Sequence, residues 1–115
     1  MERKSEVYSK FILKKLRENT FLLAFIFGSV VEKLNGHNDC DLFLVTNLRP
    51  NTEEWNLMRS STQILKQEFY KIFNLKLSIQ LLTLNDYKEQ GGFVKAIMNN
   101  SKLVLIDKMN TIGKL

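Results

Sequence analysis

The chain has 115 residues, of which 44% are hydrophobic and 25% are charged. This length suits one domain, and this balance excludes a disordered chain, because enough apolar residues recur to form a core. The net charge of +5 favours a phosphate-bearing or acidic partner. Binding to nucleic acid rests on this charge alone, since the sequence contains no motif that reads a DNA or RNA groove.

The sequence also bears on where the protein resides. No apolar run is long enough to cross a bilayer, so we expect no membrane segment. The first residues mix acids with bases and lack the apolar core of a secretory signal. Cys40 is the single cysteine, which excludes an internal disulfide and fits a reducing compartment. We therefore predict a cytoplasmic protein.

Residues 4–18 are predicted to form a helix, because apolar side chains recur at an imperfect helical spacing. These side chains are Val7, Phe11, Leu13 and Leu16. A strand is predicted over residues 21–27, which are apolar on both faces and therefore suit the centre of a sheet. Gly28-Ser29 breaks that strand, and a short helix over residues 30–34 follows the break.

Residues 35–38 (NGHN) carry a strong turn signal, and a second buried strand is predicted over residues 40–45. After a loop, Thr52 is the expected N-cap of a long amphipathic helix that ends at Asn74. Its apolar positions are Trp55, Met58, Leu65, Phe69 and Ile72.

A third strand is predicted over residues 75–82, whose apolar side chains alternate with polar ones. Residues 85–92 are predicted to be a polar loop, residues 93–98 a short helix and residues 103–106 a last strand. This order of elements predicts an α/β (α+β) fold, in which helices pack against a small mixed sheet within a single domain over residues 1–115.

Gly28 and Ser29 are the first candidate site residues. A helix N-terminus leaves backbone N–H groups unpaired and carries a positive dipole, so it can hold phosphate. Glycine allows the backbone to approach a ligand, and the serine hydroxyl can donate to a phosphate oxygen. Taken alone, the same two residues favour a plain turn in which the serine caps a helix.

Asp39 and Asp41 are the second pair of candidates. Side chains alternate along a strand, so both carboxylates point to one face, with Cα atoms roughly 6.6 Å apart, and Cys40 points to the other. This spacing allows both carboxylates to bind a hard divalent cation such as Mg²⁺. A turn explains Asp39 on its own, but it does not explain a charge at Asp41 against the apolar residues 42–45.

Together these residues give a specific resemblance. Residues 25–29 (FIFGS) followed by residues 39–45 (DCDLFLV) resemble the signature of the minimal nucleotidyltransferases of the DNA polymerase β-like superfamily. The resemblance implies that Asp39 and Asp41 are catalytic residues that bind Mg²⁺ or Mn²⁺. It also implies that Gly28 and Ser29 bind the phosphates of a nucleoside triphosphate.

The sequence departs from this family at one position. Active members carry a third carboxylate on the strand after the long helix, whereas residues 75–82 contain no acid. Ser78 or Gln80 occupies that position. Gln80 is the candidate substitute, because its amide oxygen can bind a metal weakly, although it cannot act as a base.

Two functions therefore remain open. One is a Mg²⁺-dependent nucleotidyltransferase that transfers a nucleotidyl group to an unknown acceptor, which could itself be a protein. The other is a catalytically impaired module of the same fold that acts through a partner. The resemblance implies a helical HEPN-type protein as that partner, in a toxin–antitoxin pair. Because the chain has little room for an acceptor-binding domain of its own, we expect such a partner or a homodimer.

Overall fold

The structure is a computed structural model that describes residues 3–16, 20–32 and 39–109. Its elements are α1 (Lys4–Lys15), β1 (Phe21–Phe27), α2 (Ser29–Glu32), β2 (Asp39–Thr46), α3 (Glu53–Phe73), β3 (Lys76–Thr83), α4 (Leu84–Glu89), α5 (Gly91–Met98) and β4 (Lys102–Asp107). The predicted order of helices and strands is confirmed, with α4 as an additional element. The turn predicted at residues 35–38 lies outside the described residues.

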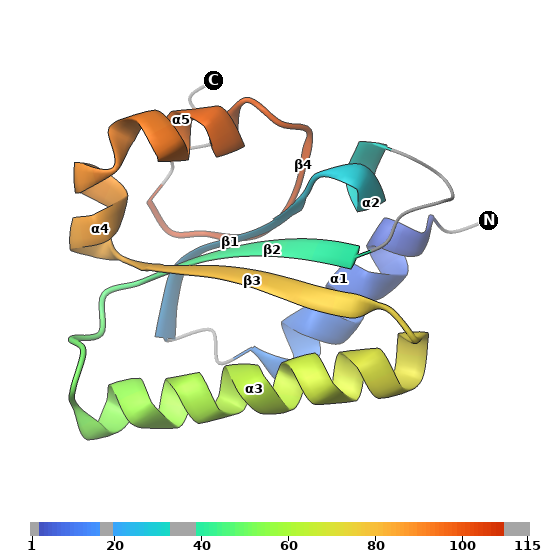
Figure 1. The fold of residues 1–115 in the computed structure, drawn as a ribbon, viewed down its shortest axis with the longest axis horizontal. Coiled ribbons are helices and arrows are strands. Elements are labelled where there is room, and N and C mark those ends of the chain that lie inside the picture. Colours follow the sequence, from blue (N-terminus) through green and yellow to red (C-terminus); the bar gives the residue numbers. More distant parts are fainter. Residues whose placement is uncertain (1–2, 17–19, 33–38, 110–115) are drawn as a thin grey trace.

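The four strands form one mixed sheet in the order β3-β2-β1-β4. β2 and β3 are parallel, and β1 is antiparallel to both of its neighbours. Figure 1 shows α1 and α3 on one side of the sheet and α4 and α5 on the other. This architecture confirms the predicted α/β fold, in which helices cover both faces of a small mixed sheet.

Helices can cover both faces because the central strands are apolar on both. On one face Leu42 and Leu44 pack in a buried cluster with Phe69 of α3. On the other face Phe25 and Phe43 stack with ring centroids 4.9 Å apart, in a second cluster that includes buried residues of α5. The end of β1 and the polar start of β2 thereby lie side by side at one end of a sheet that is packed on both faces.

The predicted apolar stripe of α1 is partly wrong. Val7 and Leu13 are each 37% exposed, whereas Tyr8 and Ile12 are buried. The helix turns this way because the Tyr8 ring packs edge-on against Phe69 of α3, with centroids 5.2 Å apart. A spacing within α1 cannot reveal that aromatic partner, because it lies on another element.

The long helix α3 begins and ends as predicted. The Thr52 side chain accepts a hydrogen bond from the Trp55 N–H at 3.2 Å, and Asn74 ends the helix with a left-handed φ of 52°. The inclusion of Ile72 among its core positions is wrong, because this side chain is 59% exposed. Phe69 is fully buried in the same part of the helix, which leaves Ile72 at the flank.

The loop predicted for residues 85–92 is also wrong, because α4 and the start of α5 occupy it. Thr83 and Asp86 form a capping box: the Thr83 hydroxyl accepts from the Asp86 N–H at 3.0 Å, and the Asp86 carboxylate accepts from the Thr83 N–H at 3.4 Å. These bonds start a helix directly at the end of β3. Among the described residues, no helix is both long and apolar enough to cross a membrane.

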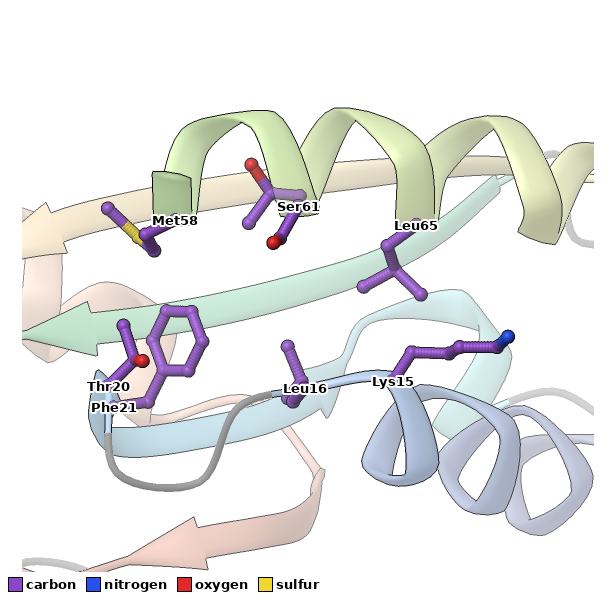
Figure 2. Close-up of a pocket in the computed structure, with 8 residues that line it drawn as sticks. Lys15, Leu16, Thr20, Phe21, Met58, Ser61 and Leu65 are labelled. Carbon is purple, nitrogen blue, oxygen red and sulfur yellow. The ribbon is translucent and has the colours of Figure 1, made fainter. Parts of the chain in front are cut away.

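A small cavity of about 10 Å³ lies between the end of α1, the start of β1 and α3. Figure 2 shows the side chains that line it. This volume is about that of one water molecule. The Lys15 amino group forms an ion pair with Glu68 at 3.2 Å. The cavity lies beside Phe21, at the opposite end of β1 from Gly28, so it is a packing gap that is separate from the candidate site residues.

Candidate functional site

The candidate site begins with the turn at the end of β1. Gly28 has a φ of +81°, a left-handed conformation that side chains rarely adopt. Its carbonyl accepts hydrogen bonds from the N–H groups of Val31 and Glu32, at 3.0 and 3.1 Å. Gly28 therefore ends the strand and starts the single turn of α2, whose first residue is Ser29.

Gly28 also lies against one of the two aspartates. A Cβ atom at this position would lie 2.7 Å from Oδ2 of Asp41, which is closer than such atoms approach. The pairing of the strands explains the contact, because Phe27 lies directly opposite Asp41. The missing side chain makes room for the carboxylate, so the glycine turn and the aspartate belong to one site.

Asp39 and Asp41 are the first and third residues of β2, and both are half-buried. Burial raises the pKa of the Asp41 carboxyl, and the nearby charge of Asp39 raises it further. Ionisation of Asp41 is therefore less favourable than that of a free aspartate, and a bound cation would offset this difference. Two carboxylates on one face are the oxygen ligands that Mg²⁺ and Mn²⁺ accept, together with water and phosphate oxygens, so these residues fit a divalent cation.

Cys40 contributes no ligand to this pair. Its side chain is fully buried in the apolar cluster on the opposite face of β2, as predicted. Burial, followed by the charges of Asp41 and Asp39, raises the pKa of its thiol to about 12. A thiol in this state stays protonated and is inert as a metal ligand and as a nucleophile.

The register of β3 decides which residue lies beside the aspartates. Ser78 pairs with Asp41, whereas Gln80 pairs with Phe43, one side chain further along the same face. Gln80 is exposed and Ser78 is half-buried. Among the described residues, no group of three histidine, cysteine or acidic side chains is placed to hold a metal. His37, in the predicted turn next to the pair, lies outside the part of the chain that the structure describes.

Lys102 is a neighbour of the site that the sequence did not single out. It pairs with Phe27, which pairs in turn with Asp41, so all three side chains lie on one face of the sheet. The Lys102 ammonium donates to the carbonyls of Met98 and Asn100, the latter at 3.0 Å. It thus fixes the end of α5 beside the site. Only the pairing of β4 with β1 reveals this position.

A mixed sheet whose glycine turn and aspartate pair meet at the end of two central strands has the architecture of a nucleotidyltransferase. The family described as polymerase beta, nucleotidyltransferase matches residues 10–110. The chain therefore belongs to this family, whose members generally use a divalent metal. None of the curated proteins compared with the chain matches it.

Two solved structures have a similar fold. A chain in the complex of tri-AMPylated Shewanella oneidensis HEPN toxin with MNT antitoxin superposes with a TM-score of 0.52 at 16% identity, over 90% of this chain and 72% of that one. A chain of a mutant MntA–HpeT toxin–antitoxin superposes with a TM-score of 0.57 at 14% identity, over 92% and 78%. The resemblance to minimal nucleotidyltransferases is thus confirmed at the level of the fold.

Proposed function

We propose that this protein is a nucleotidyltransferase that depends on a divalent cation and transfers a nucleotidyl group from a nucleoside triphosphate to an acceptor. One observation carries the proposal: the open side of Gly28 lies against Oδ2 of Asp41. A glycine turn suited to phosphate and a carboxylate suited to a cation are thereby adjacent. Nucleotidyl transfer needs both functions at one place.

The aspartate pair and the glycine turn have separate roles in this reaction. Asp39 and Asp41 would hold Mg²⁺ or Mn²⁺, which when bound would neutralise charge on the phosphate and lower the pKa of an attacking hydroxyl. The Gly28-Ser29 turn binds phosphate through its backbone N–H groups and the Ser29 hydroxyl. An acceptor oxygen forms a bond to the α-phosphorus, and the bond to the departing pyrophosphate breaks. Because β3 offers no carboxylate, the acceptor's proton passes to water or to the pyrophosphate.

The second candidate is a catalytically impaired module that acts as the antitoxin of a toxin–antitoxin pair. The acid-free strand β3 supports it, because nothing on this strand can take a proton or add a charged ligand. Both candidates share one partner. The tri-AMPylated toxin in the similar complex supports a helical HEPN-type protein, as the acceptor in the first case and as the bound toxin in the second.

Transfer of label separates the two candidates. We would incubate the protein with α-³²P-labelled nucleoside triphosphates, Mg²⁺ or Mn²⁺, and the helical protein encoded beside it. The enzyme labels that protein, whereas the Asp41→Asn variant does not. Glu89→Gln, which removes an exposed carboxylate of α4, serves as the matched control and keeps activity. A stable complex without transfer of label supports the antitoxin. The absence of both label transfer and complex formation contradicts both candidates.

A further inference from the structure

A groove runs along the outer edge of β3, on the side of the sheet where α3 packs. β3 is the first strand of the sheet, so only β2 pairs with it in the described part of the chain. Two adjoining hollows of about 380 and 330 Å³ lie between this strand and α3, and both are lined by Gln63 and Lys66. Together they extend from Trp55 to Tyr70, whose ring is 57% exposed.

The charge in this groove has one sign. Arg59, Lys66 and Lys76 line it, and no acidic residue does. Within residues 3–16, 20–32 and 39–109, none of these three cations forms an ion pair, and Lys76 is the cross-strand neighbour of Asp39. The glutamates of α3 lie elsewhere on the helix, and Glu68 pairs with Lys15 of α1. The groove therefore favours an acidic occupant.

The edge of the sheet indicates the form of that occupant. An edge strand presents a row of unpaired N–H and C=O groups, which another extended peptide can satisfy and a nucleic acid cannot match. A second copy of this chain would place like charges together along the shared edge. We propose that β3 binds an acidic, extended segment of a partner protein, which adds a strand to the sheet and contacts Arg59 and Lys66.

The binding test uses a fluorescein-labelled peptide that alternates glutamate with valine and has the eight-residue length of β3. Anisotropy measures its affinity, and the fluorescence of Trp55, the single tryptophan, reports occupancy of the groove. We expect the acidic peptide to bind at least about tenfold more tightly than the same peptide with lysine for glutamate. A tighter fit of the lysine peptide, or no binding of either one, overturns the proposal.

Two controls locate the contact. We expect Lys66→Glu to lower the affinity for the acidic peptide by about tenfold. Lys71→Glu, which reverses an exposed charge of α3 outside the groove, leaves its affinity unchanged. Because alternate amides of a strand face its neighbour, N-methylation of one alternate set abolishes binding and methylation of the other does not. Equal effects of the two sets, tighter binding of an oligouridine, or dimerisation through this edge overturns the proposal.

Discussion

Gly28 occupies a position that excludes a side chain for two separate reasons. Its φ of +81° is strained for any other residue, and a Cβ would collide with Oδ2 of Asp41. We expect Gly28→Ala to lower the free energy of unfolding by about 1–3 kcal/mol. It should also weaken Mn²⁺ binding, because the carboxylate has to move. Urea denaturation measures the first effect and titration calorimetry the second.

Gly92→Ala is the matched control for this prediction. Nothing lies within 4 Å of a Cβ built at Gly92, which belongs to α5. This substitution should be neutral or stabilising by up to about 1 kcal/mol, since alanine favours helices over glycine. Equal stability of the two variants would show that the turn tolerates a side chain and that the contact with Asp41 is not close.

Asp41 should make stability depend on pH in a direction that is unusual for an acid. Its folded-state pKa is raised, by burial and then by Asp39, so between the unfolded and folded pKa values the native state binds more protons. Its contribution to stability is therefore greatest below the unfolded pKa and is lost as pH rises through the folded one. Without metal, Asp41→Asn should be more stable than the wild type at neutral pH.

This difference should shrink below about pH 4, where both states of the wild type are protonated at this position. Paired urea titrations in EDTA across that range measure it. Added Mg²⁺ should reverse the order at neutral pH, because the cation stabilises the ionised pair only in the wild type. An Asn variant that is less stable at every pH in EDTA would contradict the direction of the Asp41 pKa.

At the scale of elements, the parallel register of β2 and β3 determines where a third carboxylate would act. Ser78 lies beside Asp41, and Gln80 lies one pair further, beside Phe43. We expect Ser78→Asp to raise affinity for Mn²⁺ by about tenfold, because it adds a charged oxygen ligand to the pair. Calorimetry measures the affinity, and label transfer shows whether turnover increases as well.

Gln80→Glu is the control, because it adds the same charge to the same strand at an exposed position beside an aromatic side chain. It should change the affinity for Mn²⁺ much less. A larger effect of Gln80→Glu than of Ser78→Asp would mean that the metal sits further along β3. In that case Gln80 would be the residue that takes the third position.

The elements differ in how far sequence alone predicts them. β1 and β2 could be predicted, because apolar residues run through both strands and Gly28-Ser29 ends the first. α3 could be predicted because Thr52 and Asn74 mark its ends. α4 was not predicted from the sequence. The segment is short and mostly polar, so it has no apolar periodicity, and the feature that starts the helix is the reciprocal hydrogen bonding of Thr83 with Asp86.

For the candidate site, the sequence predicts which side chains share a face of one strand, but it does not predict which residues lie beside them on the neighbouring strands. The alternation of side chains along one strand places Asp39 and Asp41 on one face and Cys40 on the other. The contact between Gly28 and Asp41 depends on the pairing of β1 with β2, and the place of Ser78 depends on the pairing of β2 with β3. Pairing between strands is set by packing across the whole sheet, which no local pattern contains.

At the scale of the molecule, a single sheet separates two apolar clusters, and the strands belong to both. Phe43, fully buried in one cluster, and Trp55, which packs against the other, therefore report on opposite faces. If residues 1–115 form a single cooperative domain, Phe43→Leu should lower its free energy of unfolding by about 1–2 kcal/mol. Probes on both faces of the sheet should then report the same change.

Urea denaturation followed by Trp55 fluorescence and by far-UV circular dichroism tests this cooperativity. We expect the two transitions to coincide in the wild type and to shift together in Phe43→Leu, with unchanged slope. The shift has to reach Trp55 through the shared strands, because Phe43 is on the opposite face from α3. A Trp55 transition that stays in place while the dichroism moves would show that the two layers unfold separately.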